Sequence, residues 1–160
     1  MPLSAMGKMR TFIALDSADK IASVEAIALL VLTKVAVARI PPRRWRSHLG
    51  PLSKDEHKSA DLETIRRVRF AIQRVLRTLP GAPNCLPQAL AARQMLKRRG
   101  IASRLFIGTL RNAEGALHFH AWLKVGDEWV TGLCDESAYT LLLPDTADAA
   151  WPDSARRLAP

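Results

Sequence analysis

Apolar residues dominate residues 21–40, the most hydrophobic stretch of the chain. The stretch predicts a helix that runs to about Arg39, where Pro41 and Pro42 stop it. At roughly 20 residues it is nearly long enough to cross a bilayer, but three charged side chains interrupt it. These are Glu25, Lys34 and Arg39. We therefore interpret it as a buried or interfacial helix and expect no membrane span.

Two more helices are predicted between residues 61 and 100. Asp61 opens a stretch in which apolar residues recur every three or four positions, while arginines fall largely elsewhere. After a Pro-Gly break, Asn84 is the candidate N-cap of a helix whose first residue is Cys85. Basic residues and Gly100 close this helix, so its capping signals are strong at both ends.

Beyond this helix the pattern changes to that of β-strands. Three strands are predicted, over residues 103–110, 116–125 and 128–133. Short turns join them as two hairpins in series, which gives an antiparallel sheet with Trp122 and Trp129 on or beside it. The predicted fold class is α+β, with N-terminal helices and a helix packed on a small antiparallel sheet.

The composition fits a single domain over residues 1–160, because 48% of the residues are apolar and can build a core. We divide it into a helical N-terminal part with a basic connector at 1–58, a core at 59–143 and a tail at 144–160. The net charge is +9, and residues 61–110 alone carry an excess of eight positive charges. Such a polarised chain is suited to an acidic peptide or partner domain.

Cysteine usage predicts a reducing environment. Cys85 and Cys134 lack CxxC spacing, and residues after Met9 lack the order of a signal peptide. We therefore expect a cytoplasmic protein without disulfides and predict no cofactor.

Cys85 is the first candidate for chemistry. A thiol attacks as thiolate, and the free N–H groups and macrodipole of a helix N-terminus stabilise negative charge there. The same N–H groups could hold an oxyanion formed by attack on a carbonyl. The alternative interpretation is a small buried residue on a helix rich in alanine and leucine.

A general base is the second requirement, and the chain has four histidines. His48 and His57 lie in or beside the basic connector. His118 and His120 are two residues apart on a predicted strand and therefore share a face. A lone strand histidine is usually structural, and it is the combination with a helix-start cysteine that indicates nucleophilic catalysis.

Three motifs follow one another in a recognisable order: NCLPQAL at residues 84–90, GIA at 100–102 leading into LFIG at 105–108, and HFHAWL at 118–123. Together they resemble the transglutaminase-like leader peptidases of lasso peptide biosynthesis, over roughly residues 60–143. The resemblance implies a papain/transglutaminase-like core and a catalytic role for the segment 59–143.

The resemblance also implies a function. Such enzymes use Cys, His and an acid to remove the leader from a lasso peptide precursor, so that the core can be cyclised. Cys85 corresponds to the nucleophile and His120 to the base. The implied partners are the precursor peptide, a separate leader-recognition protein and an ATP-dependent lasso cyclase.

The third catalytic residue departs from the family's pattern. The acid often lies on the strand after the His-Ala-Trp strand, about where this chain has Thr131 and Gly132. The nearest acids are Asp127 and Asp135.

Hairpin geometry favours Asp135. If residues 126–127 form a two-residue turn, His120 lies opposite Leu133 and His118 lies opposite Asp135. Asp135 is then diagonal to His120 on the same face, within reach of the ring directly or through water. We therefore predict that Asp135 orients His120, with a backbone carbonyl or amide as the alternative orienting group, because a bulge in the hairpin would reverse the pairing.

Other functions fit parts of the pattern. A transglutaminase-like fold could act as a non-catalytic scaffold that docks the precursor or the cyclase. An arginine-rich helix face could bind nucleic acid, but no nucleic-acid motif accompanies it, and we expect no nucleic-acid partner. A metal-binding protein is a further alternative, and the spacing of its Cys and His ligands supports a metal site only weakly. Its ligands would be Cys85, His118, His120 and Cys134.

Overall fold

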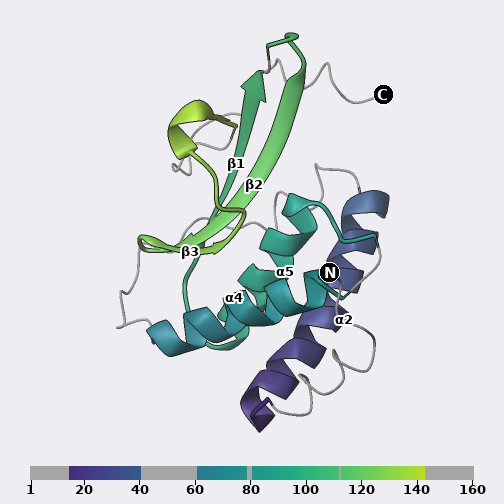
Figure 1. The fold of residues 1–160 in the computed structure, drawn as a ribbon, viewed down its shortest axis with the longest axis vertical. Coiled ribbons are helices and arrows are strands. Elements are labelled where there is room, and N and C mark those ends of the chain that lie inside the picture. The colour runs from purple at the N-terminus through teal and green to yellow at the C-terminus, as the bar shows by residue number, and fades with distance from the viewer. Residues whose placement is uncertain (1–14, 41–60, 79–80, 112, 143–160) are drawn as a thin grey trace, which may run out of the picture.

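The structure is a computed structural model that describes residues 15–40, 61–78, 81–111 and 113–142. Within these residues, three helices lie on one face of a four-stranded antiparallel sheet (Figure 1). The helices are α2 (Ser17–Arg39), α4 (Leu62–Leu76) and α5 (Cys85–Arg98). The strands are β1 (Arg104–Arg111), β2 (Leu117–Val125), β3 (Glu128–Thr131) and β4 (Thr140–Leu141). The predicted α+β class is confirmed.

Parts of the predicted organisation lie outside the described residues. They include the basic connector at 43–58, with His48 and His57, and the tail at 144–160.

Polar side chains fix the starts of two helices. Asp61 caps α4 by accepting a hydrogen bond from the Glu63 N–H at 3.1 Å, as its position in the sequence predicts. Asp16 caps α2 through the Asp19 N–H, 2.6 Å away. Asn84 is the N-cap residue of α5, also as predicted, but its side chain makes no capping hydrogen bond.

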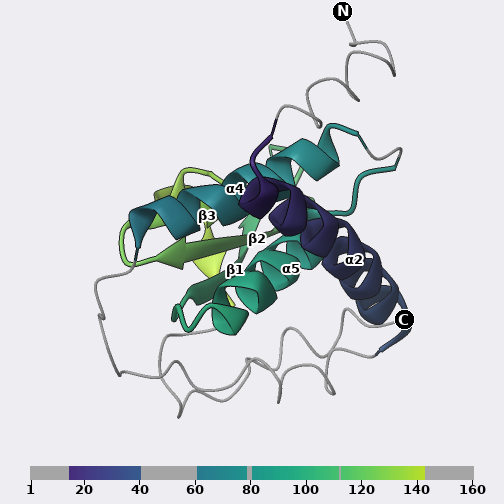
Figure 2. The ribbon, with the colours of Figure 1, turned by 90° about the horizontal axis from the view of Figure 1, so that it is seen from below.

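The three helices share one hydrophobic core with the inner face of the sheet, and Figure 2 shows α2 lying across α4 and α5. The core includes Ala22 and Leu30 of α2, Ile72 of α4, Leu96 of α5 and Leu123 of β2. The N-terminal helix is therefore part of the same packed unit as the rest of the fold.

Two arginines of α4 fasten it to α2. Arg67 bonds Asp19 at 3.1 Å, and Arg74 donates to the Ser23 hydroxyl at 2.6 Å. Arg66 and Arg77 are exposed instead. Arg69 of α4 instead pairs with Glu128 of β3 at 2.9 Å, so the arginines in and just after this helix divide into those that pack on α2, one that contacts the sheet and those that face solvent.

The second hairpin begins as predicted, because Val125 pairs with Glu128 across a two-residue turn. A bulge then shifts the register: Lys124 pairs with Trp129, but Leu123 pairs with Thr131, where β3 ends. The extra residue lets two successive β3 residues, Val130 and Thr131, both be buried.

The predicted pairings of His120 with Leu133 and of His118 with Asp135 are consequently wrong. The shift of one residue reverses which β3 positions share a face with His120.

Residues 132–142, which we call the strap, cross the face of the sheet opposite the helices. Alternate residues of β2, such as Ala121 and Leu123, belong to the helix-facing core, so Trp122 and His120 face the strap. The Trp122 indole donates to the Glu136 carboxylate at 2.8 Å. The strap ends in β4, which pairs with β1 at the edge of the sheet.

Candidate active site

Cys85 is the first residue of α5 and packs against the edge of the hydrophobic core with its side chain partly exposed. Because Asn84 makes no side-chain capping bond, it leaves the N–H groups of Cys85 and Leu86 for another acceptor. Pro87, the third helical residue, has no N–H and fits the first turn of a helix. The thiol therefore stands beside a helix start that its own cap residue does not block.

Side chains from α2 and α5 hold the segment around Cys85. The Thr33 hydroxyl donates to the Pro87 carbonyl at 2.9 Å, and the Lys34 ammonium donates to the Gly81 carbonyl at 2.9 Å. The Gln88 amide donates to the Pro83 carbonyl at 2.6 Å. The helix predicted only as buried or interfacial thus helps to position the cysteine, a role that its sequence pattern does not reveal.

His120 lies on β2 with its ring held on three sides. Its Nε2 is 2.8 Å from the carbonyl oxygen of Gly132. The ring stacks on Trp122, with centroids 6.0 Å apart, and lies tilted against Tyr139 at 5.5 Å. The strap therefore supplies both a polar and an aromatic contact to the candidate base.

The hydrogen bond to Gly132 determines the tautomer of His120. A carbonyl oxygen only accepts hydrogen bonds, so Nε2 must carry the proton. In the neutral ring, the lone pair that can take up a proton is then on Nδ1. A backbone carbonyl thus does for His120 what a carboxylate does in a triad: it fixes the tautomer and the ring orientation.

Gly132 is required at this place by its backbone. Its φ is +72°, and an added Cβ would collide with the Ala121 carbonyl oxygen and lie 2.9 Å from Cβ of Trp122. This position lies where the resemblance places an acid, and here it contributes a carbonyl. The sequence left a backbone carbonyl or amide open only as an alternative to Asp135 and Asp127, because no residue type identifies such a group.

We expect Gly132→Ala to lower the free energy of unfolding by about 2–4 kcal/mol, since it combines left-handed strain with a steric collision. Gly115→Ala is the matched control, because Gly115 has φ +81° but nothing within 4 Å of an added Cβ. Its cost should be only about 1–2 kcal/mol. Urea unfolding of both variants measures the difference, and equal losses would show that the packing around Gly132 is loose.

Asp135 has a different partner from the one predicted. Its Oδ1 accepts hydrogen bonds from the Ser137 N–H at 3.1 Å and the Ser137 hydroxyl at 2.7 Å, so it caps the short 3-10 helix Glu136–Ala138. No hydrogen bond joins it to His120 within the described residues. Asp127 is exposed in the turn. These contacts do not test the predicted catalytic role of Asp135, and the variant Asp135→Asn described below tests it.

Helix and strand lengths place the start of α5 level with His120 along the strand direction. Residues 99–103 connect α5 to β1, so the end of the helix adjoins the beginning of the strand, and Figure 1 shows the two running in opposite directions. The 14 residues of α5 span about 20 Å, which corresponds to about six strand residues. This reaches the part of β1 that pairs with His118 and His120.

Cys85 and His120 thus belong to the same end of the structure, but the His120 ring faces the strap, on the side of the sheet opposite the helices. In the part of the chain that the structure describes, no hydrogen bond connects the thiol to the ring, whose Nε2 is bound to Gly132. Catalytic hydrogen bonds in unliganded proteins are often long and tighten only with substrate.

The residues of the alternative metal site do not form a cluster. Across the described residues, no group of three or more His, Cys, Asp or Glu side chains could hold a metal ion. His118 is exposed on β2. Burial raises the pKa of the Cys134 thiol, and the neighbouring carboxylates of Glu136 and Asp135 raise it further.

A cysteine at a helix start, packed on an antiparallel sheet that carries an oriented histidine, defines an α+β protein whose fold is compatible with a cysteine peptidase. The chain belongs to the transglutaminase-like superfamily, whose family model matches residues 27–143. The match begins within α2, so it includes more of the N-terminal helix than the motifs alone indicate. Searches of curated proteins and of solved structures found no match.

Proposed function

We propose that this protein is a cysteine peptidase that removes the leader from a lasso peptide precursor so that the core can be cyclised. The membership of the transglutaminase-like superfamily supports the peptidase class, and the order of the three sequence motifs supports the leader-peptidase role. The observation that carries the proposal is the bond from His120 Nε2 to the Gly132 carbonyl, because it leaves Nδ1 as the base.

In the first step, Nδ1 of His120 takes the proton of the Cys85 thiol, and the sulfur attacks the carbonyl carbon of the scissile peptide bond. The carbon–sulfur bond forms as the carbonyl π electrons move to oxygen. The N–H groups at the start of α5 are placed to stabilise that oxyanion.

In the second step the tetrahedral intermediate collapses. The carbon–nitrogen bond breaks, and the proton on Nδ1 passes to the departing amine, which becomes the new N-terminus of the core peptide. In the imidazolium both ring nitrogens are donors, so the Gly132 carbonyl remains a suitable acceptor throughout. Water, deprotonated by Nδ1, then attacks the thioester and releases the leader with a free carboxylate and the Cys85 thiol.

The proposed partners are the precursor peptide, a separate leader-recognition protein and an ATP-dependent lasso cyclase, and the proposed location is the cytoplasm. The net charge of +9 supports attraction of an acidic leader or partner domain.

The direct test is incubation of the full chain with a lasso precursor, with and without a leader-recognition protein, followed by mass spectrometry. We expect one cut, which gives a leader with a free C-terminal carboxylate and an intact core. An uncleaved precursor that is nevertheless bound would contradict the peptidase proposal.

The non-catalytic scaffold is the second candidate function, and the lack of a thiol–imidazole hydrogen bond between the described Cys85 and His120 favours it. Alkylation by iodoacetamide near neutral pH distinguishes a peptidase from a non-catalytic scaffold. An activated Cys85 should react much faster than a free cysteine peptide, whereas the thiol of a scaffold should react more slowly.

We expect Asp135→Asn to retain turnover within about threefold, because the Gly132 carbonyl already orients His120. Asparagine also caps helices well, so the bonds to Ser137 can persist and the change tests charge alone. Leader cleavage should be measured beside Asp127→Asn, which changes an exposed turn residue. A loss of about tenfold or more confined to Asp135→Asn would assign the orienting role to that carboxylate instead.

A further inference from the structure

The outward face of α2 carries large apolar side chains that no described residue covers. Six of them are between 41% and 66% exposed: Ile21, Val24, Ile27, Val31, Leu32 and Val35. The opposite face of α2, with Ala22, Ala26 and Leu30, is buried in the core. The helix is thus apolar all round, a pattern typical of helices that are covered on every side.

Helix α4 provides a comparison, because its solvent-facing side is mainly polar. Its exposed positions include Glu63, Arg66 and Gln73, and its exposed large apolar residues are Leu62 at the first position and Phe70 in the middle. The two helices pack against each other. Contact with water therefore does not account for the composition of the outward face of α2.

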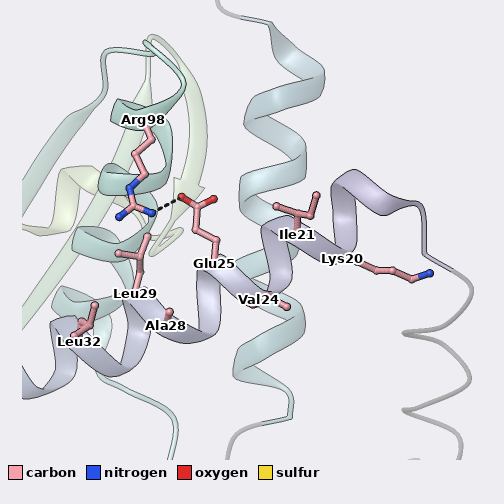
Figure 3. A pocket seen from close by; sticks show the side chains of 8 residues that line it. All are labelled: Lys20, Ile21, Val24, Glu25, Ala28, Leu29, Leu32 and Arg98. Atoms are coloured by element: carbon pink, nitrogen blue, oxygen red, sulfur yellow. Dashed lines mark hydrogen bonds and ion pairs between the residues drawn. The ribbon is translucent and has the colours of Figure 1, made fainter.

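A groove of about 520 Å³ lies along this face, between α2 and the end of α5 (Figure 3). Ala28 lines it between the larger Val24 and Leu32, and Arg98 of α5 forms another part of its wall. A small residue flanked by larger ones leaves a hollow of the kind that takes the side chains of a neighbouring helix.

The charge at the groove is positive. Glu25 accepts ion pairs from two arginines, Arg98 at 3.1 Å and Arg99 at 2.7 Å, so its single negative charge is more than balanced. The Arg98 side chain is still 55% exposed, and Lys20 also lines the groove. A partner that buries its apolar side chains here would be stabilised by carboxylates at their margin.

We propose that the groove on the outward face of α2 docks an amphipathic helix of another protein, with an apolar stripe flanked by acidic residues. A second copy of this chain would bring like charges together at the groove, and the chain carries +9 overall. By length and composition α2 could cross a membrane, but its inner face is committed to α4 and α5. A flat bilayer surface also fits a hollow less well than a ridge of side chains does. This surface is independent of the peptidase proposal.

The test uses the full chain and a fluorescent helical peptide of about 18 residues, with leucines at i, i+3, i+4 and i+7 and glutamates on both flanks. A second peptide has lysines in place of the glutamates. By fluorescence anisotropy, the acidic peptide should bind at least about tenfold more tightly than the basic one at low salt. Lys20→Glu combined with Arg98→Gln should reduce that preference at least threefold.

Leu32→Asp should weaken binding of the acidic peptide at least about tenfold, whereas Phe70→Asp on α4, the matched control, should bind within twofold of the unmodified chain. Circular dichroism must show that both variants are folded. Equal binding of the two peptides would overturn the proposal. So would Leu32-dependent binding to phosphatidylglycerol vesicles without peptide binding, which would indicate a bilayer, or a Leu32-dependent dimer in sedimentation, which would indicate a second copy.

Discussion

Replacing Cys85 with alanine should lower leader cleavage at least about 1,000-fold and leave the fold intact. Cys85 supplies the sulfur of the proposed thioester, which alanine cannot form. Alanine is a better helix former than cysteine, and the side chain is only partly buried, so the free energy of unfolding should fall by about 1 kcal/mol or less. Single-turnover cleavage followed by mass spectrometry, beside thermal unfolding by circular dichroism, measures both quantities.

Cys134→Ala is the matched control for this result. Because burial and two nearby carboxylates raise the pKa of the Cys134 thiol, the thiolate form is scarce at neutral pH and the residue is a poor nucleophile. Its replacement should leave turnover within about twofold. Cleavage that survives Cys85→Ala but is lost in Cys134→Ala would move the nucleophile to the strap and contradict the assignment made from the helix start.

The local features of the fold could be predicted from the sequence. Asp61 and Asn84 mark helix starts because their short polar side chains suit the N-cap position. The Gly126-Asp127 pair predicts a two-residue turn, and Val125 and Glu128 do pair across it. Each of these predictions depends on a few neighbouring residues and on backbone preferences alone.

The surroundings of His120 could not be predicted in the same way. Strand pairing from the turn depends on parity, and one extra residue in β3, Val130, opposite the step from Lys124 to Leu123 changes every later pair. The group that meets the ring is the carbonyl of Gly132, which every residue type possesses, so no residue identity points to it. The one local clue in the sequence is the glycine itself, because glycine favours the left-handed φ that Gly132 adopts.

The outward face of α2 shows a further limit. In an amphipathic helix the polar side identifies the opposite, apolar side as the buried one, and the arginines of α4 do this. In α2 both sides are apolar, so the sequence predicts a buried or interfacial helix without saying which side meets the core. Only the contacts with α4 and α5 distinguish the two faces.

His120→Ala should lower leader cleavage at least about 100-fold, whereas His118→Ala should retain it within about threefold. The two histidines lie on the same face of β2, and their surroundings differ. His120 is held by the Gly132 carbonyl and two aromatic rings, which leaves Nδ1 as the proton acceptor. His118 is exposed and pairs with Leu110 toward the end of the hairpin.

Chemical rescue distinguishes a catalytic His120 from a structural one. Removal of the ring leaves a space beside Trp122 and Tyr139 in which free imidazole could stack, with the Gly132 carbonyl still available to accept its N–H. Added imidazole at millimolar concentration should therefore raise the cleavage rate of His120→Ala at least about tenfold and leave the rate of Cys85→Ala unchanged. If imidazole raises the thermal stability of His120→Ala without restoring cleavage, the ring serves the packing of the strap, and the base must be sought at His118.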